Sequence, residues 1–212
     1  MNLTQTDATL LQSLYAITLV AVVVSSASGV LKAGYKRFDL FGVVIIAITT
    51  GLGGGSLRDM LLDRPVFWVA DQSYFIASLA SALIIFLLAR VRRITADAFL
   101  IPDAAGLAAF GVAGTLAALM AGAPWLVASF MGVMTGTMGG VFRDVLSDEP
   151  PLVFQSTLYA TVCWAGSLLF ILLLEAGLGV TPAALLAGCG IFFARLLAIR
   201  YNLTLPRFTP HD

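Results

Sequence analysis

The chain has 212 residues, of which 59% are hydrophobic and 11% charged, with a net charge of +0 and a mean hydropathy of +0.97. Soluble domains carry about 25% charged residues, so this composition excludes an ordinary soluble domain and points to a membrane protein. The balanced charge gives no reason to expect a nucleic acid partner. With one His and two Cys there is no metal-ligand spacing, and we expect no metal and no cofactor.

Seven apolar runs are candidates for membrane-spanning helices, because a bilayer core needs about 20 mostly apolar residues. In chain order they cover residues 11–32, 40–62, 74–88, 104–121, 125–146, 159–174 and 182–199. No basic segment precedes the first run, so we expect it to be retained rather than cleaved as a signal peptide. The sequence therefore predicts an all-α membrane protein with seven transmembrane helices in a single transmembrane domain, residues 1–212.

The basic residues predict the orientation of these spans. Ten of the 12 Lys and Arg fall on one side of the predicted membrane, and only Arg58 and Arg64 fall on the other. The ten are Lys32, Lys36, Arg37, Arg90, Arg92, Arg93, Arg143, Arg195, Arg200 and Arg207. Because basic loops stay in the cytoplasm, we expect the N-terminus outside and the C-terminus in the cytoplasm.

One stretch of the sequence occurs twice. Residues 51–65 read GLGGGSLRDMLLDRP and residues 136–150 read GTMGGVFRDVLSDEP, identical at eight of 15 positions with an offset of 85. The same offset pairs Gly29 with Gly114, which extends the similarity into the preceding span. The repeat unit is then three spans, residues 10–90 and 100–176 approximately, and the seventh helix, about 181–199, has no counterpart.

Three spans per unit is an odd number, so the second unit must enter the membrane upside down relative to the first. Such inverted repeats usually place a permeation or substrate site near the midplane, between interrupted helices. Glycines in the repeated stretch predict the interruption, since they favour a kink or unwound turn whose carbonyls line a cation path. They are Gly51, Gly53, Gly54, Gly55, Gly136, Gly139 and Gly140. The alternative is that these small residues let helices pack closely.

Polar residues beside the glycines complete the candidate site. The hydroxyls of Ser56, Thr135 and Thr137 either help to line the path or bond back to their own helix. The charged candidates for the two mouths of the path, or for gating, are Lys32, Arg58, Asp59, Arg143 and Asp144. Adjacent helical residues point about 100° apart, so we do not expect Arg58 to face Asp59. The alternative role for both Arg-Asp pairs is anchoring helix ends at the membrane surface.

Nothing in the sequence has the pattern of a catalytic centre. The only His is His211 in the tail, and we find no Ser/His/Asp set and no phosphate-binding loop. A hydrolase within the membrane would need a buried nucleophile and base, and none is visible in the sequence. We therefore expect a protein that is not an enzyme.

In the repeated glycine-rich stretches and the segment before the first of them, the chain resembles the prokaryotic members of the TRIC family, the trimeric intracellular cation channels. The resemblance rests on SGVLKAGYKRFDLFG at 28–42 and on the two glycine-rich stretches. It implies a homotrimer in a prokaryotic inner membrane. Each subunit would hold a K⁺-permeable pore bounded by the glycine-kinked second and fifth helices. The chain departs from the family at Met138, where a third glycine is expected, and at residues 114–119, which lack the polar and basic residues of many relatives.

Two functions fit this pattern. The first is a channel for monovalent cations, and the alternative is a secondary transporter of a small zwitterion such as glycine, since inverted repeats suit both. The sequence favours the channel, because no buried carboxylate outside the repeated motif is visible to serve as a coupling site. A structural membrane protein without transport activity is the third class.

Overall fold

The computed structural model describes residues 3–36, 38–91, 95–155 and 158–206. These residues form eight α-helices: α1 (Leu3–Ala33), α2 (Leu40–Leu61), α3 (Phe67–Ala70), α4 (Ser73–Val91), α5 (Leu100–Met120), α6 (Trp125–Leu146), α7 (Ala160–Glu175) and α8 (Val180–Arg200). Three short 3-10 helices, η1 (Gly34–Lys36), η2 (Ala96–Phe99) and η3 (Leu152–Phe154), lie in the connections.

Seven of these helices coincide with the seven apolar runs of the sequence. Six are long and apolar enough to cross a membrane, and α7, with 16 residues, is the short one. At 1.5 Å per residue α7 is about 24 Å long, somewhat less than a typical bilayer core. The prediction of an all-α membrane protein is confirmed within the described residues.

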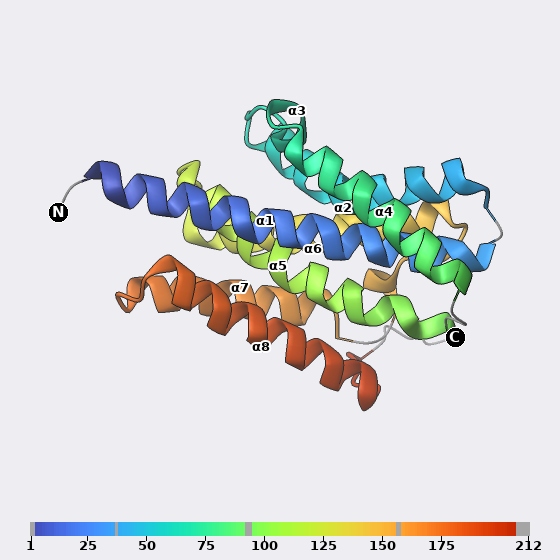
Figure 1. Ribbon diagram of the computed structural model, residues 1–212. Helices are drawn as coiled ribbons and strands as arrows, with labels where there is room; N and C mark the ends of the chain where they lie inside the picture. The colour runs from blue at the N-terminus through green and yellow to red at the C-terminus, as the bar shows by residue number, and fades with distance from the viewer. Residues whose placement is uncertain (1–2, 37, 92–94, 156–157, 207–212) are drawn as a thin grey trace.

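The helices form one elongated bundle in which α1 runs through the middle (Figure 1). Helices α2 and α4 lie on one side of α1, and α7 and α8 lie on the other (Figure 1). Helix α5 packs against α1, α6, α7 and α8 and is the most buried span. We call α1, α2 and α4 the first half and α5, α6 and α7 the second half. The halves meet where α1 packs on α5 and α2 packs on α6.

Helices α2 and α6 end in the same way, 85 residues apart. Asp63 and Asp148 have positive φ angles of 51° and 52°. The amide of Arg64 donates to the carbonyl of Asp59, and that of Glu149 donates to the carbonyl of Asp144. This is the Schellman arrangement, in which a left-handed residue after the helix lets later amides bond its last carbonyls.

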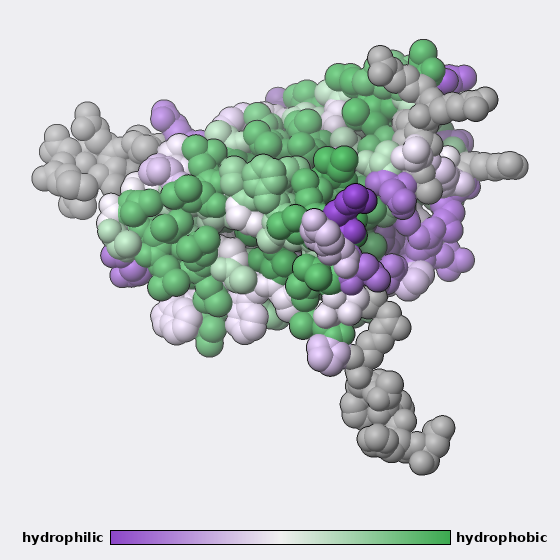
Figure 2. Space-filling model, turned by 90° about the horizontal axis from the view of Figure 1, so that it is seen from below, coloured by the Kyte–Doolittle hydropathy of each residue, from purple (hydrophilic) through white to green (hydrophobic). Residues whose placement is uncertain are grey.

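The outer surface of the bundle is apolar along its length. Figure 2 shows hydrophobic side chains over the middle of one face and hydrophilic side chains gathered towards the ends. Large exposed apolar side chains come from most of the spans, among them Phe41, Ile84, Phe130 and Leu185. Such a surface is unstable in water and suits lipid tails, so the chain is a multi-pass membrane protein.

Two of the ten basic residues counted for orientation lie inside the bundle rather than in a loop. Arg143 is 0% exposed and Arg195 is 1% exposed. Four others, Arg37, Arg92, Arg93 and Arg207, lie outside the described residues. The orientation rule concerns residues in loops, so Arg143 and Arg195 do not count towards it, and neither does Arg58, which is buried in α2. Eight basic residues then remain on that side against one, Arg64.

Candidate functional site: the crossing of α2 and α6 and its two arginine residues

Helices α2 and α6 touch backbone to backbone at the repeated glycines. A Cβ added at Gly54 would overlap the carbonyl oxygen of Thr135 on α6. A Cβ added at Gly139 would overlap the carbonyl oxygen of Thr50 on α2. The second contact is the first with each residue replaced by its counterpart 85 positions away, as expected if a two-fold axis relates the halves. Only glycine allows this distance of approach, so the sequence element that repeats is the helix crossing itself.

The unwound turn expected at these glycines is not formed, and this expectation is corrected. Both clusters lie inside uninterrupted α-helices, Leu40–Leu61 and Trp125–Leu146. The physical reason is the helix crossing. A helix with glycines on one face can pack closely against another helix and still keep all its backbone hydrogen bonds. The close-packing alternative therefore accounts for Gly54 and Gly139, while a bend without unwinding stays a prediction.

The other glycines face different neighbours. A Cβ would meet Ser26 at Gly51, the Phe142 ring at Gly53, the Phe67 ring at Gly55, the carbonyl of Leu107 at Gly136 and the Tyr159 hydroxyl at Gly140. The glycines of each cluster therefore let several different elements pack closely against the helix, and they do not all face one path. Gly51 and Gly136 again correspond, since each lies against the helix that opens its own half, α1 or α5.

The hydroxyls beside the glycines bond back to their own helices. Thr135 and Thr137 donate to the carbonyls of Met131 and Val133, at 2.7 and 2.8 Å, and Thr50 donates to that of Ile46 at 2.6 Å. Ser56 donates to Leu52 at 2.8 Å and also accepts from Trp68 Nε1. These bonds satisfy the hydroxyls locally, the alternative that the sequence left open.

Each arginine of the repeated motif is paired with the aspartate that follows it, contrary to the expectation that the two would face apart. Arg58 Nε lies 2.8 Å from Asp59 Oδ1, and Arg143 Nε lies 2.9 Å from Asp144 Oδ1. The long, flexible arginine side chain turns back along the helix to reach its neighbour. The second oxygens of Asp59 and Asp144 accept the amides of Phe67 and Leu152, again 85 apart.

The two arginines differ in what else they meet. Arg143 Nη1 donates to Asp103 Oδ1 of α5 at 2.5 Å and to Ser28 of α1 at 2.7 Å. Its guanidinium also lies 4.9 Å from the centre of the Phe99 ring. We call Arg143, Asp144, Asp103, Ser28 and Phe99 the Arg143 cluster. All five are buried, with Arg143 at 0% and Asp103 at 6% exposure, so this end of the crossing is filled by protein.

Lys32 lies beside the Arg143 cluster, against the same Phe99 ring. Its Nζ lies 2.5 Å from Glu149 Oε2 and 4.6 Å from the centre of the Phe99 ring. Lys36 reaches the other oxygen of Glu149 at 3.1 Å. The hydrogen bond from Lys32 lowers the pKa of the Glu149 carboxyl below its ordinary value, and Lys36 acts in the same direction. The end of α1 is thereby tied to the segment that follows α6.

Arg58 borders a cavity of about 590 Å³ at the other end of the crossing. We call it the Arg58 cavity. Its lining comes from α1, the end of α2, and the chain through α3 to the start of α4: Leu11, Gln12, Leu14, Tyr15, Thr18, Arg58, Asp59, Arg64, Pro65, Phe67, Ala70, Asp71 and Tyr74. Arg58 is 4% exposed, and its Nη1 has no hydrogen-bond partner among the described residues. One end of the crossing is therefore hollow and has charged side chains in its lining, while the other is packed.

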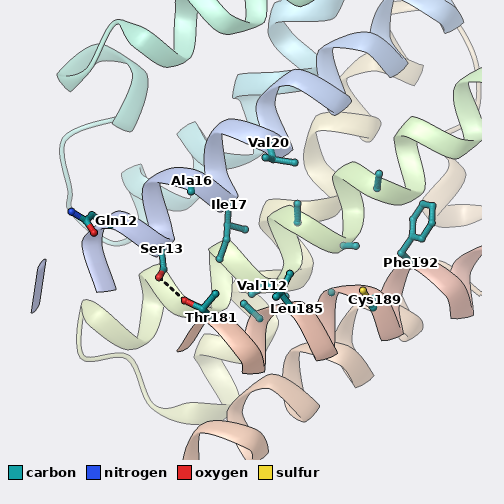
Figure 3. Close-up of a pocket in the computed structure, with 15 residues that line it drawn as sticks. Gln12, Ser13, Ala16, Ile17, Val20, Val112, Thr181, Leu185, Cys189 and Phe192 are labelled. Carbon is teal, nitrogen blue, oxygen red and sulfur yellow. Dashed lines mark hydrogen bonds between the residues drawn. The ribbon is translucent and has the colours of Figure 1, made fainter. Parts of the chain in front are cut away.

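A second hollow, of about 680 Å³, lies between α1, α5 and α8 (Figure 3). Its lining is almost wholly apolar, with side chains such as Ile17, Val112 and Phe192. The polar exception is at one end, where Ser13 and Thr181 are 3.2 Å apart. This groove offers no charged group, so we do not assign the passage of an ion or a zwitterion to it.

Asp103 is the functional candidate that the sequence analysis missed. It is a buried carboxylate outside the repeated motif, so the expectation that the chain has no such carboxylate to serve as a coupling site is wrong. The predicted span began one residue later, at 104, whereas α5 begins at Leu100, so Asp103 lies within the helix. An ionisable residue within a span is by default a candidate functional residue. Glu149 was also missed, since its pairing with Lys32 joins segments 117 residues apart.

Comparison with known proteins agrees with this architecture. A family model described as "Glycine transporter" matches residues 15–90 and again residues 100–175. A UPF0126 membrane protein of Vibrio cholerae is 40% identical over 92% of this chain and 82% of its own length. The UPF0126 inner membrane protein YadS of Escherichia coli K12 is 39% identical over 92% of this chain and 95% of its own length.

Solved structures give the same result. The TRIC channel orthologue of Rhodobacter sphaeroides superposes with a TM-score of 0.85 and 32% identity, over 90% of this chain and 98% of that one. A prokaryotic TRIC channel in 0.5 M KCl superposes with a TM-score of 0.82 and 27% identity, over 91% of this chain and 98% of that one. A TRIC channel of Caenorhabditis elegans, at 16% identity and a TM-score of 0.60, shares the fold alone. The UPF0126 proteins, the family model described as a glycine transporter and the solved TRIC channels all match this chain over most of its length. The chain therefore belongs to the prokaryotic TRIC family of membrane proteins.

Proposed function

We propose that the chain is a channel for monovalent cations, K⁺ in particular, with one pathway in each subunit along the crossing of α2 and α6. The observation that carries the proposal is the similarity to solved TRIC cation channels over nine-tenths of the chain, at up to 32% identity. The neighbours are channels rather than enzymes, which supports a protein without catalytic activity. The name of those channels also supports a homotrimer, and that of YadS supports the inner membrane.

The crossing suits a gate in this pathway. Two glycine contacts hold α2 against α6, so no ion passes between them in this arrangement. When the helices separate, the carbonyl oxygens of Thr50 and Thr135 lose their cover and face the gap. Backbone carbonyls in a water-lined space are the ligands that K⁺ prefers in channels. In this proposal, conduction needs a small displacement of α2 relative to α6 rather than an unwound turn.

The test is recording from the purified protein in planar bilayers under a KCl gradient. We expect unitary currents whose reversal potential lies towards the K⁺ equilibrium potential. Asp59→Asn should shift that potential towards the Cl⁻ value, because it leaves the Arg58 charge uncompensated beside the Arg58 cavity. Asp63→Asn is the matched control, since it removes the same charge from an exposed residue four positions away and should leave the potential unchanged.

A specific observation favours a second function, secondary transport of a small zwitterion such as glycine. The bundle has a hollow end at Arg58 and a packed end at Arg143, and a carrier with inverted repeats is open to one side at a time. Absence of unitary currents combined with saturable uptake of labelled glycine into proteoliposomes would replace the channel proposal with this one.

A further inference from the structure

The Arg58 cavity contains a buried positive group with unused hydrogen-bonding capacity. Arg58 directs Nε and Nη2 to one oxygen of Asp59, each at 2.8 Å, and its ring contact is with Phe67. Nη1 is left without a partner, although it is buried. A buried donor without an acceptor destabilises the folded state, and more so when it is charged. An acceptor that reached this nitrogen from the cavity would remove that cost.

The second half of the molecule shows which acceptor fits. There Nη1 of the equivalent Arg143 donates to the carboxylate of Asp103. With the offset of 85, the counterpart of Asp103 in the first half is Thr18, on α1. The contacts of neighbouring residues support this correspondence, since Gly51 lies against the Val22 carbonyl and Gly136 against that of Leu107. The first half thus has the arginine but no carboxylate of its own in this position.

We propose that the Arg58 cavity binds the carboxylate of a small molecule, in the place that the Asp103 side chain occupies beside Arg143. Thr18 leaves room for such a group, and the hydroxyl-bearing residues Tyr15, Thr18 and Tyr74 line the same cavity. Arg64 brings a second guanidinium to the lining. A carboxylate held by arginine forms charge-assisted hydrogen bonds, about twice as strong as neutral ones.

The carboxylate can belong to a free monocarboxylate or to an amino acid. A cavity of about 590 Å³ has room for either. Asp71 also lines it, so an amino acid would find an acidic group for its ammonium within the same space. The site goes beyond the channel proposal, because it is a binding property of the closed molecule and stands whether ions or zwitterions cross the membrane.

The experiment measures binding without transport. The unfolding midpoint of the full-length protein in detergent micelles is followed during titration with sodium acetate, which replaces sodium bromide so that the ionic strength stays constant. We expect the midpoint to rise in the wild type. Thr18→Asp supplies an internal carboxylate to Arg58, so the acetate response should weaken at least tenfold in apparent affinity. Thr18→Asn, which has the same size without the charge, should respond within about threefold of the wild type.

Further arms separate the outcomes. Arg58→Lys keeps the charge but removes Nη1, and it should lose the response even if Thr18→Asp fails to fold. A response to both acetate and glycine supports a carboxylate site, and a response to glycine alone supports the carboxylate of an amino acid. An equal rise with chloride, no rise at all, or an undiminished response in Arg58→Lys overturns the proposal. Failure to detect currents would leave these results unaffected, so the two proposals fail separately.

Discussion

Thr50 and Thr135 lie where single residues determine how closely the two halves of the molecule pack. Their carbonyl oxygens lie where a side chain at Gly139 or Gly54 would begin. Each threonine hydroxyl also bonds to the carbonyl one turn earlier, which fixes the side chain away from the contact. The crossing is therefore specified by two glycines and two threonines, one of each from either helix.

Gly54→Ala and Gly139→Ala should each destabilise the protein, because the added methyl overlaps a backbone oxygen that cannot move without separating the helices. Overpacking of this kind costs about 1–3 kcal/mol. The matched control is Gly190→Ala on α8, where the nearest atom is Leu169 Cδ2 at 4.0 Å. There alanine should be neutral or stabilising, since it is the better helix former. Equal unfolding midpoints for the three variants would contradict the crossing.

Asp103→Asn should be more damaging than most single substitutions in this chain. It removes one of the two carboxylates that compensate Arg143, and breaking a buried ion pair costs about 3 kcal/mol or more. The control is Asp97→Asn, which makes the same chemical change at an exposed residue of η2. Chemical unfolding in micelles would measure both, and a small effect at Asp103 would mean that Asp144 alone compensates the arginine.

At the scale of elements, ion pairs between side chains join the end of α1 to the segment after α6. Lys32 and Lys36 both reach Glu149, whose carboxyl has a lowered pKa. A group with a lowered pKa in the folded state stabilises that state above its ordinary pKa, about 4.3 for glutamate, and loses this contribution as the pH falls. Because Glu149 is partly exposed, the contribution is about 0.2–1 kcal/mol.

Glu149→Gln should therefore lower the unfolding midpoint at pH 7 and have a smaller effect at pH 3.5, because the contribution of the carboxylate decreases as the pH falls below about 4.3. Glu175→Gln is the control, an exposed residue at the end of α7. Thermal unfolding of both variants and the wild type at the two pH values would measure the difference. A Glu149→Gln effect of the same size at both pH values would show that the side chain acts through packing instead.

At the scale of the whole molecule, the orientation in the membrane is the remaining prediction. Ala70 and Gln155 are exposed and occupy equivalent positions in the two halves, and the predicted topology places them on opposite sides of the membrane. In a Cys189→Ser background, Ala70→Cys should react with an impermeant maleimide in intact cells, and Gln155→Cys only after the membrane is opened. The reverse pattern would place the N-terminus in the cytoplasm. Cys163 is buried and does not interfere.

The sequence was sufficient for the helices and for the internal repeat. Hydropathy fixes which segments enter lipid, since a span needs only its own apolar residues, and α6 was predicted with its observed bounds. The repeated Arg-Asp and glycine positions were visible because they lie close together in sequence. The prediction that Arg58 would not face Asp59 was wrong because helical geometry describes Cβ directions, whereas a long side chain can turn back.

Only the tertiary structure decided what these residues do. The glycines accommodate a crossing helix rather than a break, because the partner backbone comes from a segment 85 residues away. The same holds for Asp103, which meets Arg143 only after α5 and α6 pack together. Side-chain chemistry and lipid solubility are properties of the local sequence, so they could be read directly. Which arginine meets a second carboxylate depends on how the two halves pack, and no local pattern records that.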